Sequence, residues 1–215
     1  MYRTGFGDCF LVSFGPEATS HHVLIDFGAH MHGEIGTMDQ IMDSIETTTG
    51  RKLALLVATH AHRDHISGFG KFAARFAAFD IGEVWLPWTD DPNDQQAAAL
   101  NKKQLSLYQA LDTHLKIGLG LSGATANPRD AAALNALANL MGNEKATSEL
   151  GRRFGTKAKV RYLSSGKSIA KVAGVAGLSA EILGPSRDQT FLARMDPPAE
   201  QRFLTAPNTN HPDNT

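Results

Sequence analysis

Three histidines and one aspartate stand within six residues, directly after an apolar run that predicts a buried strand. The run 53–59, LALLVAT, is apolar at nearly every position, which is typical of a strand with both faces covered. The next residues read HAHRDH, so the polar cluster begins where the strand ends. The cluster consists of His60, His62, Asp64 and His65.

Alternation along an extended segment lets His60 and His62 point the same way and reach one ion together. Asp64 and His65, in the turn into the following helix, are expected to reach an adjacent position. Imidazole and carboxylate ligands favour zinc, or iron or manganese in some settings, and catalytic zinc keeps one position for water. In the alternative interpretation the histidines are surface residues and Asp64 is the N-cap of the next helix. Capping accounts for Asp64 but not for three clustered histidines, so we favour the metal site.

Periodicity in the first half of the chain predicts the order strand, strand, helix, strand, helix, strand. The first two strands are expected to form a β-hairpin, and Gly50 is expected to end the first helix. The predicted elements, in order, are 10–14, 23–27, 38–49, 53–59, 66–79 and 83–88.

The second half of the chain changes in composition. Between about residues 91 and 155 it is rich in Ala, Leu, Gln, Asn and Lys, with helical periodicity, which predicts a helical insertion. Strands are expected to resume at 159–163 and 178–183, with a turn at SSGKS between them. We therefore expect one domain over residues 1–215, with the segment 91–155 inserted into it.

Composition excludes few classes of function. The 215 residues carry a formal net charge of -1, which gives no global electrostatic footprint for nucleic acid or an anionic membrane. Cys9 is the single cysteine, so no internal disulfide can form, and a cytoplasmic location is expected. No run approaches the roughly 20 apolar residues of a membrane span, and the N-terminus lacks the apolar stretch of a signal peptide.

The run HAHRDH resembles the H-x-H-x-D-H signature of the metallo-β-lactamase superfamily. The opening, GFGDCFLVSFG followed by VLIDFG, is similar to the start of this superfamily, especially its branch of hydrolase-like domains from competence DNA-uptake proteins. The resemblance covers about residues 5–88, and more loosely the strands around Tyr162 and Ile182.

This resemblance implies an αββα sandwich with the motif on the loop after an inner strand. It implies that His60 and His62 bind a first zinc ion, and that Asp64 and His65 bind a second. Asp64 would also be catalytic, and Asp26 would occupy the position of a supporting carboxylate that orients a ligand histidine.

Three further residues are expected near such a site and could line a substrate pocket: Asp8, His30 and His32. The expected reaction is hydrolysis by a metal-bound hydroxide. Relatives of this fold cleave amides, thioesters, lactones and phosphodiesters, so the substrate, a small molecule or a phosphodiester, stays open.

The chain also departs from the family pattern. Members complete the site with a later aspartate and at least one further histidine, whereas His211 is the only histidine here after His114. The sequence resembles the N-terminal half of the sandwich plus an insertion, C-terminally incomplete. The alternative function is therefore a catalytically incomplete fragment, or a degenerate metal-binding or interaction protein. A third possible function is that of an iron-dependent oxidoreductase of the same superfamily. The exposed faces of a half-sandwich would favour a homo-oligomer.

Overall fold

The computed structural model describes residues 1–16, 20–31, 36–121, 128–188 and 190. The chain divides into two compact units, 1–185 and 186–215. All helices, strands and sites discussed below lie in the first unit.

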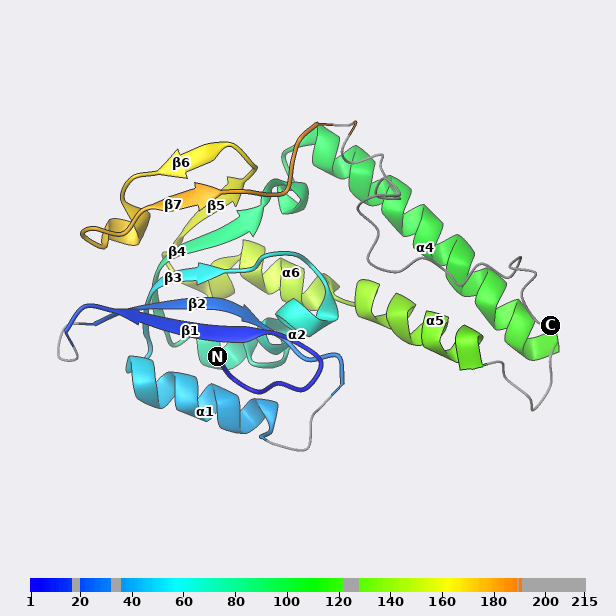
Figure 1. The fold of residues 1–215 in the computed structure, drawn as a ribbon, viewed down its shortest axis with the longest axis horizontal. Coiled ribbons are helices and arrows are strands. Elements are labelled where there is room, and N and C mark those ends of the chain that lie inside the picture. The colour runs from blue at the N-terminus through cyan, green and yellow to red at the C-terminus, as the bar shows by residue number, and fades with distance from the viewer. Residues whose placement is uncertain (17–19, 32–35, 122–127, 189, 191–215) are drawn as a thin grey trace, which may run out of the picture. The chain divides into compact units, whose positions relative to one another are not determined.

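A five-stranded, mostly parallel sheet forms the centre of this unit (Figure 1). The spatial order is β1-β2-β3-β4-β5, with β1 antiparallel to β2 and every other neighbouring pair parallel. The sheet confirms the predicted α/β class, the predicted β-hairpin and the strand at 159–163. The strands are β1 (Cys9–Phe14), β2 (His21–Phe27), β3 (Lys52–Val57), β4 (Asp80–Pro87) and β5 (Lys159–Leu163).

One face of the sheet packs against helices and forms the larger core. Helix α1 (Met38–Thr49) begins with a capping box between Thr37 and Gln40 and ends at Gly50, whose φ of 56° suits glycine. Phenylalanine rings fill the space between sheet and helices, with Phe27 stacked on Phe72 at 5.6 Å between ring centroids. Phe27, Phe69 and Phe76 are fully buried.

The helix expected at 66–79 is two helices, α2 (Arg63–Lys71) and α3 (Ala73–Phe76). Phe72 separates them with non-helical φ and ψ of -105° and 22°. Helix α2 also starts earlier than expected, because His62, with extended φ and ψ, is its N-cap. Asp64 therefore lies inside the first turn and is not the N-cap, which contradicts the alternative interpretation of that residue.

Helices fill the segment between β4 and β5. Helix α6 packs on α2 and adds Ala146 and Leu150 to the larger core. Helices α4 and α5 contact each other on the side of the sheet where β3 and β4 end (Figure 1). The helices are α4 (Gln95–Leu121), α5 (Pro128–Leu140) and α6 (Glu144–Gly151), flanked by the 3-10 turns η2 (Trp88–Asp90) and η3 (Arg153–Gly155).

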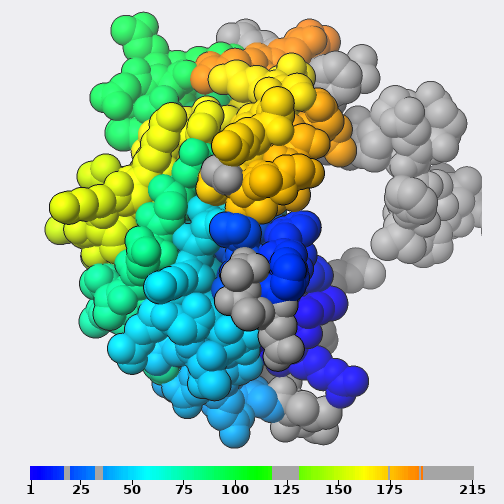
Figure 2. Space-filling view, turned by 90° about the vertical axis from the view of Figure 1, so that its left-hand side faces the viewer, coloured from blue at the N-terminus to red at the C-terminus, as the bar shows by residue number. Residues whose placement is uncertain are grey.

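The opposite face of the sheet is covered by a small antiparallel pair, β6 (Lys167–Ile169) and β7 (Ala180–Ile182), with the turn η4 (Val172–Gly174) between them. These residues pack on Val23, Leu55 and Trp85 in a second, smaller core. Figure 2 shows this yellow and orange segment beside the blue first hairpin. Strand β6 occupies part of the predicted turn, since three residues are too few to show a strand period.

None of the described helices is both long enough and apolar enough to cross a membrane.

Candidate metal centre

Three of the four motif side chains converge on one point after β3. The possible ligand atoms of His60, His62 and Asp64 all lie within 4.8 Å of one another. His65 completes the group, because its Nε2 is 3.5 Å from Oδ2 of Asp64 and its ring centroid is 3.8 Å from that of His60. The sequence assigned Asp64 to a second ion with His65, whereas the structure groups its carboxylate with His60 and His62.

Asp26 orients two of these histidines. Its Oδ2 lies 2.9 Å from Nδ1 of His65, and its two oxygens accept hydrogen bonds from the Thr59 backbone N–H at 2.8 Å and the Thr59 hydroxyl at 2.7 Å. An ionised carboxylate only accepts, so the proton of His65 sits on Nδ1 and leaves Nε2 as the ligand atom.

The same reasoning extends to His60. Its Nδ1 lies 3.0 Å from the Thr59 hydroxyl oxygen. Because the Thr59 hydroxyl proton is given to Asp26, this oxygen accepts from Nδ1 of His60, and Nε2 of His60 is left free. A single carboxylate thus sets the tautomers of two possible ligands, one directly and one through Thr59.

A β-bulge places Asp26 in this position. In the β1–β2 ladder Cys9 pairs with Phe27 and Phe10 pairs with Ile25, so Asp26 is the extra, unpaired residue. Its φ of 53° is in the left-handed region, which is costly for a residue other than glycine. Bulges commonly re-aim a side chain next to a functional site, and here the hydrogen bonds from Thr59 and His65 offset the strain.

The N-terminal turn holds the backbone of the motif. The Asp8 N–H donates to the carbonyl of Asp64 at 2.9 Å, and the Gly28 N–H donates to the carbonyl of Asp8 at 3.0 Å. A Cβ on Gly28 would lie 2.5 Å from the carbonyl carbon of Asp64 and from the nitrogen of His65. The approach of β2 to the start of α2 therefore requires glycine at position 28.

Asp8, Asp26 and His65 form a second group of possible ligands in the described part of the chain. Oδ2 of Asp8 is 3.6 Å from Nδ1 of His65, beyond a good hydrogen bond, while Asp26 already takes that nitrogen. We interpret this group as the support of His65, because Nδ1 cannot both donate to Asp26 and bind a cation.

Burial keeps two of the histidines neutral. Burial, together with the neighbouring His65 and His62, lowers the pKa of His60 to about 4. Burial also lowers the pKa of His62. Both rings are therefore unprotonated at neutral pH, which is the form that binds metals.

Helix α5 contributes contacts that the sequence did not predict. Asn139 forms two hydrogen bonds with Asp64, and Asn135 lies 2.6 Å from Nε2 of His30. Just after the helix, Asn143 donates to the carbonyl of Ala61 at 2.9 Å. The spacing of four between these asparagines indicates a common helix face, but only the tertiary structure shows what this face meets.

Of the remaining predicted residues, Asp8 lies beside the cluster at His65, His30 lies apart from it, and two histidines lie outside the described residues. His30 contacts Asn135 and the edge of Phe6. Asp8 is near His65, with 38% of its side chain exposed. His32 and His211 lie outside the described residues.

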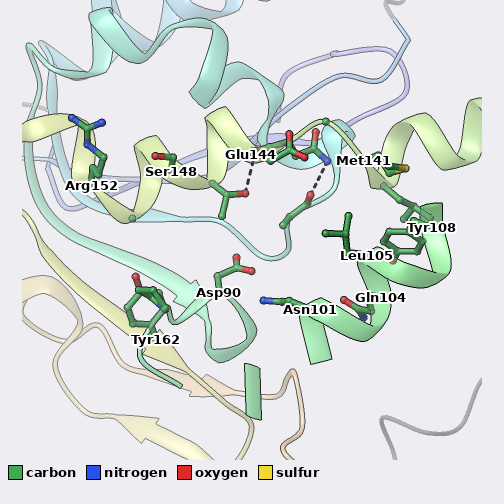
Figure 3. A pocket seen from close by; sticks show the side chains of 17 residues that line it. Asp90, Asn101, Gln104, Leu105, Tyr108, Met141, Glu144, Ser148, Arg152 and Tyr162 are labelled. Atoms are coloured by element: carbon green, nitrogen blue, oxygen red, sulfur yellow. Dashed lines mark hydrogen bonds between the residues drawn. The ribbon is translucent and has the colours of Figure 1, made fainter. Parts of the chain in front are cut away.

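A cavity of about 670 Å³ adjoins the motif loop (Figure 3). Ala61, which stands between the two histidines of the loop, lines it. Asp90, the last residue of η2, points into the cavity, and burial raises the pKa of its carboxyl to about 6. Other lining residues are Leu105, Tyr108, Met141, Arg152 and Tyr162. Its position at the C-terminal ends of parallel strands is where α/β sheets usually bind ligands.

No family model, curated protein or solved structure matched this chain.

Proposed function

We propose that this chain is a metal-dependent hydrolase related to the N-terminal half of the αββα sandwich of the metallo-β-lactamase superfamily, and that its motif residues hold zinc. The observation that carries the proposal is the convergence of His60, His62 and Asp64, whose ligand atoms lie within 4.8 Å of one another. Two imidazoles and a carboxylate match the three protein ligands of many catalytic zinc sites. Iron and manganese accept the same ligand types, so metal analysis must decide between them.

Zinc bound in such a site lowers the pKa of water towards neutrality and polarises the bond to be cleaved. The residues of the chain have separate tasks. His60 and His62 would hold the ion as neutral ligands, and His65 would present Nε2 to the same region. Asp64 would bind the ion through Oδ2, its oxygen that does not bond to Asn139, and would act in catalysis as a ligand of the metal that activates the water. The hydrogen bonds from Thr59 and His65 to Asp26 would keep the ligand tautomers constant.

The cavity beside Ala61 is the proposed location for the organic part of the substrate. Its volume of about 670 Å³ is typical of small-molecule sites. The cavity is lined by two carboxyl side chains, Asp90 and Glu144, and one cation, Arg152. Asp90, with a pKa of about 6, is mostly ionised at neutral pH, so the acidic lining would disfavour a phosphodiester. We therefore propose a small neutral or cationic substrate in preference to nucleic acid. The buried cysteine Cys9 forms no disulfide, in keeping with a proposed cytoplasmic location.

Zinc titration of the chelator-treated chain by calorimetry tests the metal site. We expect His62→Ala to weaken zinc binding at least tenfold, because one of three ligands is lost. His114→Ala is the matched control, since His114 is an exposed histidine on α4. Equal affinities of the wild type and His62→Ala would refute the proposal.

Activity is then measured on four substrates with the metal-loaded chain: an uncharged p-nitroanilide, an uncharged thioester, a lactone and the anionic bis(p-nitrophenyl) phosphate. We expect hydrolysis of one of the first three that is lost on chelation and restored by zinc. Zinc binding without any hydrolysis would instead favour a metal-binding or interaction protein.

A further inference from the structure

Helix α5 lies against the motif through a row of amides. Asn135 and Asn139 are four residues apart, so they share one face of the helix. Asn135 contacts the loop at His30, and Asn139 contacts Asp64 in the first turn of α2. The two asparagines have the same chemistry and the same helix, but only Asn139 contacts a candidate ligand.

The side-chain amide of Asn139 forms two hydrogen bonds with Asp64. Oδ1 of Asn139 accepts a hydrogen bond from the backbone N–H of Asp64 at 3.0 Å. Nδ2 of Asn139 donates to Oδ1 of Asp64 at 2.9 Å. One amide thus fixes both the backbone and the carboxylate of this residue.

The backbone contact replaces a missing cap. The first N–H groups of a helix have no partner within it, and an N-cap side chain commonly accepts from one of them. The N-cap of α2 is His62, which makes no such side-chain bond. Asn139 accepts from the N–H of Asp64 instead, although it lies 75 residues later in the chain.

The carboxylate contact selects one oxygen. Because Nδ2 of Asn139 engages Oδ1 of Asp64, Oδ2 is the oxygen left for a cation. It lies 3.5 Å from Nε2 of His65. The Asp64 side chain is 14% exposed, so few water molecules can replace the amide as a partner.

We infer that Asn139 is a positioning residue of the metal site, which turns Oδ2 of Asp64 towards the ligand atoms of His60 and His62. The inference rests on the proposed function, because it requires Asp64 to be a ligand. Without the amide, the Asp64 carboxylate can rotate about χ2, and the start of α2 loses its cap. Partners of ligating carboxylates commonly change metal affinity by ten- to hundredfold when removed.

The experiment measures zinc affinity by calorimetry and thermal unfolding of the metal-free chain for the wild type, Asn139→Ala, Asn139→Ser, Asp64→Ala and the double variant Asp64→Ala/Asn139→Ala. We expect Asn139→Ala to weaken zinc binding ten- to hundredfold. In the Asp64→Ala background the same substitution should change the affinity by less than twofold, because Asn139 acts through Asp64. Asn135→Ala, one turn away on the same helix, should bind zinc like the wild type.

The outcomes separate the inference from the proposed function. Wild-type affinity of Asp64→Ala would show that Asp64 is not a ligand, which overturns both. If Asp64→Ala weakens zinc binding while Asn139→Ala and Asn139→Ser bind zinc like the wild type, only the inference is overturned. The inference would also be overturned if Asn139→Ala weakened zinc binding equally in the wild type and in the Asp64→Ala background. A purely structural cap would give that result. Asn139→Ser retains a polar side chain and serves if Asn139→Ala does not fold.

Discussion

His60 and Asp64 are four residues apart, yet the groups that orient them come from opposite halves of the chain. His60 is oriented by Asp26 through Thr59, and Asp26 is only 2% exposed at the end of the β1–β2 hairpin. Asp64 is oriented by Asn139, from a helix between β4 and β5. The comparison shows that a compact sequence motif can depend on two supports that differ in burial, origin and chemistry.

The supports should also differ in what their loss costs. The first support, Asp26 at the end of β2, belongs to a strand that is built into the larger core, and the adjacent Gly28 closely approaches the motif backbone. We call this the β2 side and call the support from Asn139 the α5 side. The α5 side contacts the motif through partly buried amides. Disturbing the β2 side is therefore expected to reduce both stability and metal binding, while disturbing the α5 side should mainly reduce metal binding.

The largest effect is expected for Gly28→Ala. The added Cβ would lie 2.5 Å from backbone atoms of Asp64 and His65, which cannot move without shifting α2. We expect destabilisation of roughly 1–3 kcal/mol or more, as for other overpacked sites, together with loss of tight zinc binding. Urea unfolding and zinc titration measure both. Gly151→Ala is the control, because the atom nearest to a Cβ there, the Tyr162 hydroxyl oxygen, is 3.8 Å away. A Gly28→Ala chain as stable as this control would contradict the close approach.

Asp26→Asn should come next. An amide can accept from the Thr59 backbone, but its NH₂ group faces the Thr59 hydroxyl and Nδ1 of His65, which both donate to Asp26 in the wild type. Leaving these groups mismatched should cost roughly 1–3 kcal/mol, and zinc should bind ten- to hundredfold more weakly. Urea unfolding of the metal-free chain measures the loss of stability, and zinc titration measures the loss of affinity.

Asp39→Asn is the control for this substitution. Asp39 pairs with Lys71 at 2.6 Å on the surface, and exposed pairs contribute little to stability. If both asparagine variants unfold at the same urea concentration, Asp26 is not the buried support that we describe.

The smallest expected effect is a pH dependence of stability that arises from His60. The pKa of His60 is lowered to about 4, below the ordinary value of 6.5 that applies in the unfolded chain. Between these values the unfolded state binds a proton that the folded state does not, so stability falls as the pH drops from about 6.5 to about 4. The ring is partly exposed, so the loss should be only about 1 kcal/mol. Thermal unfolding of the metal-free chain across this window should show a shallower slope for His60→Gln, and equal slopes would contradict the burial of this ring.

Local patterns predicted much of the fold. Strand 159–163, the hairpin and the helix ending at Gly50 follow from alternation, periodicity and a glycine C-cap, all of which act over a few residues. The prediction of one helix over residues 66–79 was wrong, because the helix starts earlier and is broken at Phe72. Phenylalanines at helical spacing continue from Phe69 through Phe72 to Phe79, so periodicity could not reveal the break at Phe72.

The site was predicted only in part. The cluster of His60, His62, Asp64 and His65 is contiguous in sequence, so the residue pattern alone reveals it. Asn139 carries no signal of its own, because an asparagine in a helix is more often exposed and its partner is 75 residues away. The cavity at Asp90 likewise depends on elements that meet only after folding.

The sequence by itself determined that a buried strand ends in a group of possible metal ligands, because strand burial and ligand spacing are local properties. The tertiary structure decided which atoms face the common point. The bulge at Asp26 sets the tautomers of His60 and His65, and the packing of α5 selects one oxygen of Asp64. These choices depend on hydrogen bonds between segments 33 to 75 residues apart, which local sequence patterns do not encode.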